Sequence, residues 1–393
     1  MKRIGLIVKS NLLSGAEKRF IRIFREISLR RIDNMQFYLL VNKKLYDLFI
    51  NNEEFKDIKS DNRLINSVIV FPSINSTFFN RIVPYKIKQL IEHYYINNII
   101  IKNSINIVHS GYGGGGFNLS KSKRYISCFE ITSPKVADSI YMTKRKNYVY
   151  RNFNYFRCVS ESVEKRVLAN NNDNQLVPND RIYKASLPYF IPPNRILPLN
   201  VKENHIVFAS RFIERKNPVL FASVVKEFLK LRKGWIIYIL GKGSLDYKLK
   251  EILSKEIETK TVYIGYTENL YEVLAKSKIY VSLISTDNYP SQSILEAMYM
   301  KNAIVASNTG STHRLVKDGI NGMLVELNKE AILEKLMYIT EPANSQKLAV
   351  MGEESYSLLE DEFDNNKYIQ ELLDFYDKLY DEYNFGTHDD RIK

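Results

Sequence analysis

Two cationic side chains, Arg211 and Lys216, follow an expected strand at 206–209 and could together bind a diphosphate. A guanidinium binds two oxygens at once, and an ammonium neutralises the charge that develops on a leaving group. From the spacing alone, a solvated basic turn is the simpler interpretation. The pair gains meaning only from the residues around it.

The stretch DNYPSQSILEAM at 287–298 carries the strongest site pattern. A helix that begins near Ser291 would offer the backbone N–H groups of Ser291, Gln292 and Ser293 to a phosphate. Glu296, about one turn further, could accept hydrogen bonds from a ribose diol, and Asn288 lies just before the helix. A surface glutamate on an amphipathic helix is the alternative interpretation of Glu296.

Glycines follow two of the expected strands at places where the backbone could approach a ligand closely. Gly15 opens a helix after the first strand, and Gly241 and Gly243 lie between the strand at 235–240 and its helix. Such a glycine lets a phosphate reach the N–H groups at a helix start. An ordinary helix start explains each of them equally well.

The strand that ends at His109 is followed by a third glycine segment, GYGGGG at 111–116. It formally contains G-x-G-x-x-G, but too few residues precede the next strand for the crossover helix that a dinucleotide fingerprint needs. We interpret Gly113 and Gly114 as part of a loop that lines a cleft. His109 and Glu130, each at an expected strand end, are candidates for acceptor contacts, and a packed structural role explains His109 as well.

These candidate residues can come together only if the strands before them end at the same edge of a sheet, and the sequence predicts such strands. Buried apolar runs alternate with amphipathic stretches, which predicts parallel α/β sheets with helices on both faces. The expected strands are 4–8, 37–41, 68–71, 105–109, 125–129, 156–159, 206–209, 235–240, 262–264, 279–283 and 303–306. The expected helices are 16–30, 82–101, 218–231, 245–255, 271–277, 291–300 and 363–383.

Four prolines between 186 and 204 predict a joint between two domains. We expect a first domain at 1–195, a second at 196–362 and a C-terminal helix at 363–385. Ligands of parallel α/β domains bind outside the carboxyl ends of the strands. A cleft between two such domains is therefore the expected site.

Composition and charge narrow the classes of protein that remain. The chain has 393 residues and a net charge of +13, and its 45% hydrophobic and 26% charged residues exclude a disordered chain. Two cysteines exclude a disulfide framework and a cysteine-rich metal site. The few cysteines favour a reducing compartment. Residues 1–200 hold 32 basic and 15 acidic side chains, which indicates an anionic partner such as a phospholipid surface, a lipid-linked phosphate, an acidic glycan or a nucleic acid. A solvated basic face is the alternative.

In this order and strand context, the motifs resemble the family 4 retaining glycosyltransferases across essentially the whole chain. The matching segments are Ser14-Gly15-Ala16-Glu17, Ile107-Val108-His109, Cys158-Val159-Ser160-Glu161, Ala209-Ser210-Arg211 through Lys216, Gly241-Lys242-Gly243, Leu295-Glu296-Ala297-Met298, Ala303-Ile304-Val305-Ala306 and Asp318-Gly319-Ile320-Asn321-Gly322 through Val325. The resemblance implies an α/β GT-B fold, with two facing Rossmann-like domains, parallel sheets and a central cleft. The first domain would bind the acceptor and the second the nucleotide sugar.

The resemblance also implies roles for the matching residues. Arg211 and Lys216 would bind the donor diphosphate, Glu296 the donor ribose, and Gly15 would lie near the phosphates. The C-terminal helix would cross back to the first domain. No metal and no cofactor is implied, because the nucleotide diphosphate sugar is a substrate.

Three departures from the family pattern bear on the identity of the sugar. Asn288 stands where the family has the first of its two glutamates, so an amide replaces a carboxylate. Glu130 follows Phe129 where many relatives have a histidine in a strand-end loop. His313-Arg314 replaces the usual Pro-Glu.

We therefore expect a retaining, metal-independent hexosyltransferase that moves a sugar to a glycan or lipid-linked acceptor in cell-surface polysaccharide or lipopolysaccharide assembly. A non-catalytic protein that binds sugar nucleotides is the alternative, and no nucleic-acid partner is expected. We expect a cytoplasmic location with peripheral contact to an anionic membrane, at the cytoplasmic face of the inner membrane. The residues that predict this contact are Arg81, Lys86, Lys88, Tyr85, Tyr94 and Tyr95.

Overall fold

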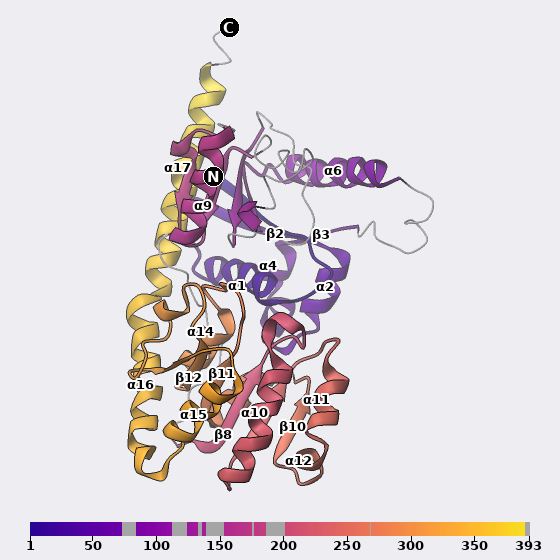
Figure 1. Cartoon of the computed structure of the whole chain (residues 1–393). Helices are drawn as coiled ribbons and strands as arrows, with labels where there is room; N and C mark the ends of the chain where they lie inside the picture. Colours follow the sequence, from indigo (N-terminus) through magenta and orange to yellow (C-terminus); the bar gives the residue numbers. More distant parts are fainter. Residues whose placement is uncertain are drawn as a thin grey trace. The chain divides into compact units, whose positions relative to one another are not determined.

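A computed structural model describes residues 1–72, 84–111, 124–132, 136–138, 153–174, 177–185, 201–267 and 269–389 (Figure 1). Gly113, Gly114 and Arg81 lie outside these described residues. The chain forms two units, of which unit 1 comprises Met1–Ile191 and Asn365–Lys393 and unit 2 comprises Pro192–Asp364.

Unit 1 is built on a seven-stranded parallel sheet with the order β3-β2-β1-β4-β5-β6-β7. Its strands are β1 (Lys2–Val8), β2 (Met35–Asn42), β3 (Val68–Phe71), β4 (Ile107–Ser110), β5 (Ile126–Ile131), β6 (Tyr155–Cys158) and β7 (Ile182–Lys184). The central strands are apolar without alternation because helices cover both faces of the sheet. The predicted parallel α/β fold is confirmed, and β7 is a short strand that the sequence analysis missed.

Two apolar cores lie on the two faces of this sheet. One face packs against α1 (Gly15–Leu29), α2 (Lys43–Ile50) and α17 (Asn365–Asp389), and the other against α6 (Tyr85–Lys102) and α9 (Glu161–Asn174). Two short helices, α3 (Lys56–Ser60) and α4 (Asn62–Asn66), complete the first face. The C-terminal helix α17, yellow in Figure 1, is therefore part of the core of unit 1.

Unit 2 contains a six-stranded parallel sheet with the order β10-β9-β8-β11-β12-β13. The strands are β8 (Glu203–Ala209), β9 (Ile236–Leu240), β10 (Val262–Gly265), β11 (Ser277–Ser282), β12 (Ala303–Ser307) and β13 (Gly322–Val325). The helices are α10 (Pro218–Leu231), α11 (Asp246–Ile252), α12 (Ser254–Glu258), α13 (Leu270–Lys276), α14 (Gln292–Tyr299), α15 (Lys329–Ile339) and α16 (Ser345–Glu362).

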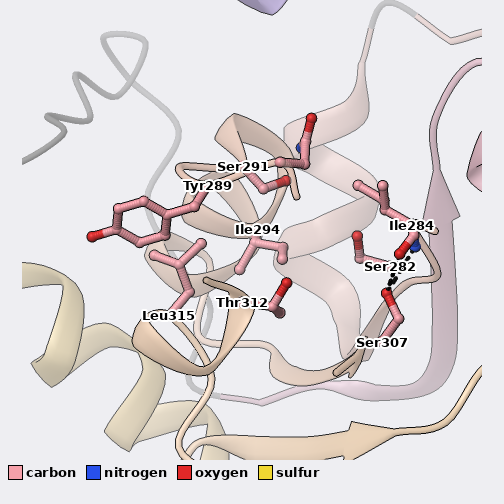
Figure 2. A pocket seen from close by; sticks show the side chains of 9 residues that line it. Ser282, Ile284, Tyr289, Ser291, Ile294, Ser307, Thr312 and Leu315 are labelled. Carbon is pink, nitrogen blue, oxygen red and sulfur yellow. Dashed lines mark hydrogen bonds between the residues drawn. The ribbon is translucent and has the colours of Figure 1, made fainter. Parts of the chain in front are cut away.

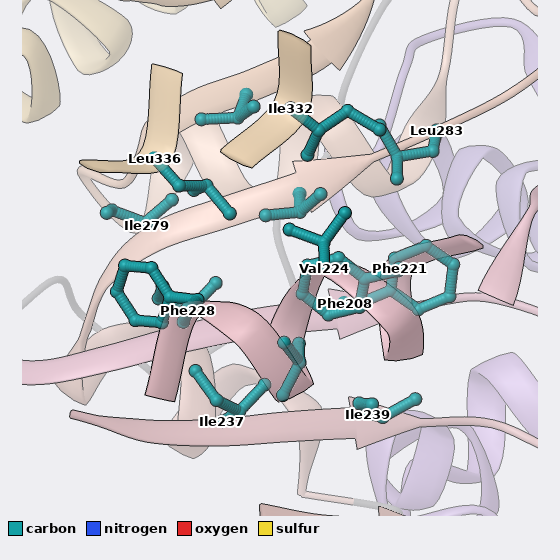
Figure 3. Close-up of a cluster of buried hydrophobic side chains, with 14 of the residues drawn as sticks. Phe208, Phe221, Val224, Phe228, Ile237, Ile239, Ile279, Leu283, Ile332 and Leu336 are labelled. Carbon is teal, nitrogen blue, oxygen red and sulfur yellow. The ribbon is translucent and has the colours of Figure 1, made fainter. Parts of the chain in front are cut away.

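The core of unit 2 holds the central strands against α10 and α15 (Figure 3). Phe208 of β8 stacks on Phe221 of α10, with ring centroids 5.1 Å apart. Leu336 of α15 packs in the same cluster as Ile279 of β11. This packing fixes the strands whose carboxyl ends carry the candidate site.

Two predictions of local structure are wrong. The single helix expected at 245–255 is two short helices, α11 and α12, because the chain leaves helical geometry at Leu253. The strand expected at 125–129 continues to Ile131 and pairs there with β6, so Glu130, expected at the strand end, lies inside β5.

Candidate active site

The strand order of unit 2 reverses between β8 and β11. From β8 the chain proceeds to β9 and β10 on one side of the sheet, and it then returns to β11, β12 and β13 on the other. Loops that leave two neighbouring strands in opposite directions open a crevice at their carboxyl ends, and ligands of open parallel sheets bind there. The loop that follows β8 carries Arg211 and Lys216, and the loop that follows β11 leads to Asn288.

These two loops are hydrogen bonded to each other. The backbone N–H of Ser285 donates to the carbonyl of Arg215 at 3.1 Å, and the amide of Asn217 donates to the carbonyl of Leu283 at 3.0 Å. The guanidinium of Arg215 also donates to the Thr286 hydroxyl at 3.3 Å. The structure therefore joins the loop that carries the predicted cations to the loop that leads to Asn288.

The loop that follows β8 lowers the pKa of Lys216. Lys216 ends a short 3-10 turn, and Asn217 then adopts a left-handed conformation that lets α10 begin at Pro218. Burial of the ammonium lowers the pKa of Lys216 to about 8, with further contributions from the charges of Arg215 and Arg211. Arg211 is exposed. An anion bound between these cations would relieve their repulsion and restore the charged form of the lysine.

The glycines at Gly241 and Gly243 have a packing role of their own. A Cβ at Gly241 would lie 1.8 Å from the carbonyl oxygen of Ser210, and one at Gly243 would lie 2.3 Å from that of Phe212. The backbone N–H of Phe212 donates to the carbonyl of Lys242 at 3.0 Å, which holds the loops after β8 and β9 together. These contacts explain both glycines, and donor binding by them stays a prediction.

A small pocket lies at the carboxyl ends of β11 and β12, beside the start of α14 (Figure 2). Its lining includes Asn288 and the buried hydroxyl residue Ser291. Ser307 of β12 lines it too, and its hydroxyl accepts from the backbone N–H of Ile284 at 2.9 Å and donates to the carbonyl of Ile284 at 2.7 Å. The pocket thus offers hydroxyl and amide groups to a polar ligand.

The first turn of α14 borders this pocket. Ser291 precedes the helix, and its hydroxyl lies 3.2 Å from that of Ser293. Gln292 and Ser293 are half-buried, as is Glu296 one turn later. The structure therefore places the predicted donor-binding residues of this segment at the start of α14 and one turn into it.

The two candidate residues of unit 1 are buried. His109 and Glu130 are both 0% exposed, and the Glu130 carboxylate pairs with Arg19 of α1. His109 Nδ1 lies 2.7 Å from the hydroxyl of Tyr376 in α17. Burial lowers the pKa of His109 well below its ordinary value, and the charges of Arg157 and Arg19 add to this, so the imidazole is neutral. Both side chains face partners inside unit 1.

Gly15 is the first residue of α1 and is exposed. The helix start is fixed by a capping box, in which the backbone N–H of Ser14 donates to the Glu17 carboxylate at 3.0 Å. Gly15 belongs to unit 1, whereas the cationic loop belongs to unit 2.

Comparison with known proteins identifies the second unit. Residues 194–358 match the model of the family described as glycosyl transferases group 1. Most of unit 2 is therefore similar to the group 1 glycosyltransferases. The whole chain is also similar to the solved structure of Anabaena HepE in complex with UDP and glucose, with a TM-score of 0.66, 13% identity and coverage of 96% of this chain and 100% of that one. Together with the two parallel sheets, this likeness shows the GT-B fold.

Two curated relatives match part of the chain. The Campylobacter jejuni protein named GalNAc-alpha-(1->4)-GalNAc-alpha-(1->3)-diNAcBac-PP-undecaprenol alpha-1,4-N-acetyl-D-galactosaminyltransferase is 28% identical over 37% of this chain and 41% of its own length. The Escherichia coli UDP-Gal:alpha-D-GlcNAc-diphosphoundecaprenol alpha-1,3-galactosyltransferase is 25% identical over 45% of this chain and 47% of its own length. Each match thus spans less than half of the relative.

Two features are absent from the part of the chain that the structure describes. Within the described ranges, no three histidine, cysteine or acidic side chains lie close enough to share a metal ion. In the same part of the chain, no helix combines the length and apolarity that crossing a bilayer requires.

Two residues that shape this candidate site were not predicted from the sequence. Asp287 accepts hydrogen bonds from the N–H of Tyr289 at 3.1 Å and of Ser311 at 3.2 Å, and so joins the loops after β11 and β12. Aspartate often accepts a hydrogen bond from the backbone N–H two residues later in a turn, so the bond from Tyr289 to Asp287 could have been predicted. Arg215 was passed over between Arg211 and Lys216, and nothing in the sequence announces its contact with the neighbouring loop.

Proposed function

We propose that this chain is a glycosyltransferase that moves a sugar from a nucleotide diphosphate sugar to a lipid-linked glycan in the assembly of a cell-surface polysaccharide or lipopolysaccharide. The observation that carries the proposal is the hydrogen-bonded pair of loops at the switch point of the glycosyltransferase domain. Both curated relatives have undecaprenol-linked acceptors in their names, and HepE was solved with UDP. These names support the donor and acceptor classes.

The donor would lie across the carboxyl ends of β8 and β11. Arg211 and Lys216 would take the diphosphate, the first turn of α14 would contribute N–H groups, and Glu296 would hold the ribose. The sugar would then extend toward Asn288, whose amide both donates and accepts hydrogen bonds. The lowered pKa of Lys216 supports this assignment, because a partly desolvated ammonium that is repelled by Arg215 and Arg211 gains most from a bound anion.

We assign a retaining, metal-independent reaction to this site. The bond from the anomeric carbon to the diphosphate oxygen would break, and a bond to the acceptor oxygen would form on the same face of the sugar. The charge that develops on the departing diphosphate would be neutralised by Arg211, Lys216 and the N-terminus of α14. The acceptor hydroxyl would pass its proton to that diphosphate, so the step needs no protein nucleophile.

The proposed acceptor sets the location. A lipid-linked glycan stays in the bilayer, so the enzyme must work at a membrane surface. We propose that it acts from the cytoplasm, at the cytoplasmic face of the inner membrane, where nucleotide sugars are available.

Thermal unfolding with a panel of nucleoside diphosphates and their sugars tests the donor site. A ligand at a hundred times its Kd adds about 2.7 kcal/mol to the free energy of unfolding, which is readily visible. We expect one base to stabilise the wild type, with and without EDTA, and the double variant Arg211→Ala/Lys216→Ala to lose this response. The matched control Lys226→Ala/Lys255→Ala removes two exposed cations elsewhere in the same unit and should respond as the wild type does.

Failure of every ligand to stabilise the wild type would refute the donor site. Loss of the response on adding EDTA would refute metal independence. Donor binding without transfer to any polyprenyl-diphosphate glycan would instead favour the non-catalytic sugar-nucleotide-binding protein, for which the amide at Asn288 is the motivating observation. Product analysis of the anomeric configuration decides whether the reaction is retaining.

A further inference from the structure

Helix α6 exposes a stripe of large apolar side chains. Ile87, Leu90, Tyr94 and Ile101 are 46%, 66%, 65% and 46% exposed, and their spacing of three, four and seven residues places them on one helical face. The opposite face is already used, because it buries residues such as Ile96 in the core of unit 1. The helix is thus apolar on both faces, and the fold of unit 1 explains only one of them.

The charges of α6 are arranged around this stripe. Lys86 and Lys88 occupy positions about 100° to either side of Ile87 on the helix, so lysine positions flank the stripe. The helix contains one carboxylate, Glu92, which is on the inner side and pairs with Lys9 at 2.5 Å. The sequence thus places two lysine positions beside the apolar stripe, and the one carboxylate of α6 is engaged by Lys9.

We propose that α6 is an interfacial helix that docks unit 1 onto an anionic lipid bilayer. The stripe would enter the boundary between headgroups and acyl chains, and the flanking lysines would contact anionic headgroups. Tyr94 and the neighbouring Tyr95, which is 45% exposed, have the apolar ring and polar tip that suit this boundary. The inference deepens the proposed function, on which it rests for its biological setting, by naming the surface that would meet the membrane of the acceptor.

The positive charge of unit 1 favours an anionic lipid bilayer as the surface that binds the stripe of α6. Residues 1–191 carry 31 basic and 15 acidic side chains, and residues 365–393 carry 4 basic and 7 acidic ones. Unit 1 is therefore net positive, which favours an extended anionic surface. From Ile87 to Ile101 the stripe extends over about 21 Å, which suits a helix lying in the plane of the interface.

The helix is also tied to the strand edge where ligands bind. Lys9 directly follows β1, and its ion pair with Glu92 holds α6 to the segment that leads from β1 to Gly15. A docked α6 would therefore keep the carboxyl edge of the unit 1 sheet at the membrane surface, which is where a lipid-linked acceptor must be reached.

Co-flotation with vesicles tests the proposal without donor or acceptor. We expect the full chain to float with vesicles that contain phosphatidylglycerol, to stay behind with pure phosphatidylcholine vesicles, and to be released by rising salt. Leu90→Glu/Tyr94→Glu should weaken the binding by about tenfold or more, because two charges would replace the centre of the stripe. The matched control Leu231→Glu/Tyr247→Glu changes residues that are 59% and 62% exposed in unit 2 and should bind as the wild type does.

Three results would overturn the inference: no flotation with phosphatidylglycerol vesicles, equal flotation with phosphatidylcholine, or unchanged flotation of the α6 variant. Since the changed side chains are exposed, both variants should keep the wild-type melting temperature and its stabilisation by nucleotide. If flotation fails while nucleotide stabilisation persists, only the docking surface is wrong. If nucleotide stabilisation fails while flotation persists, the proposed function is wrong and the docking surface stands.

Discussion

Donor affinity should fall as the pH rises through about 8, because Lys216 loses its charge there. Burial of its ammonium, together with the charges of Arg215 and Arg211, lowers the pKa of Lys216 to about 8. Below that pH the free protein presents an ammonium to the diphosphate, and above it a neutral amine. A bound diphosphate favours the charged form, so binding and protonation are linked and deprotonation must weaken binding.

The size of the effect follows from the charged fraction. With a pKa of about 8, about nine-tenths of the lysine is charged at pH 7 and about one-tenth at pH 9. If only the charged form binds tightly, the apparent Kd rises in inverse proportion to that fraction. We therefore expect about tenfold weaker donor binding at pH 9 than at pH 7, which equals about 1.4 kcal/mol.

Calorimetric titration of the stabilising nucleotide sugar across this range measures the effect, with Lys216→Arg as the matched control. Arginine keeps its charge throughout, so its affinity should stay nearly constant. Ionisation of the ligand and of all other side chains is common to both proteins and cancels in the ratio of their Kd values. A wild-type profile parallel to that of Lys216→Arg would refute the reasoning.

Two further predictions concern stability. The Lys202 Nζ atom lies 2.5–3.3 Å from four backbone carbonyl oxygens around the ends of α13 and α14, which share its N–H donors. Lys202→Met should therefore lower the free energy of urea unfolding by about 2 kcal/mol. The exposed Lys276→Met at the end of α13 should change it by less than about 0.5 kcal/mol, and equal losses in both variants would contradict the argument. Burial raises the pKa of Glu54, but the charges of Arg22 and Lys18 outweigh it and hold the pKa at about 2, so its contribution is present above pH 4.5 and is lost as the pH falls toward 2. Glu54→Gln should therefore cost about 3 kcal/mol near neutral pH and flatten the acid limb of the stability curve, and an unchanged acid limb would count against this ion pair.

The central sheets could be predicted because their strands are nearly pure apolar runs, whose pattern does not depend on distant residues. β7 escaped prediction because it has three residues and ends on the exposed Lys184. α11 and α12 were merged because their apolar spacing continues through Leu253, and only the backbone there shows the break. Strands buried on both faces of a sheet have an apolar pattern that the sequence shows. Helix ends depend on local backbone geometry, which the sequence does not show.

The sequence predicts which loops carry the candidate site residues, but not which of these loops contact each other. Arg211, Lys216 and Asn288 lie after strands, and that much follows from the sequence. The contact of their loops depends on β8 and β11 being neighbours, although β9 and β10 lie between them in the chain. The packing demands on Gly241 and Gly243 likewise come from the loop after β8, which no local pattern specifies.

The C-terminal helix shows why unit 1 cannot be understood from its first 191 residues alone. Tyr376 supplies the hydroxyl beside His109, and Tyr368 accepts a hydrogen bond from the buried Arg157 at 2.9 Å. Without α17, Arg157 would lose that hydrogen bond and the aromatic side chains that cover it, and among the described residues would keep only its 3.8 Å contact with the Glu130 carboxylate. The chain reaches α17 only after completing α16 of the glycosyltransferase domain. The core of unit 1 is therefore completed by the last segment of the chain, so the two units share one polypeptide path even though each has its own sheet.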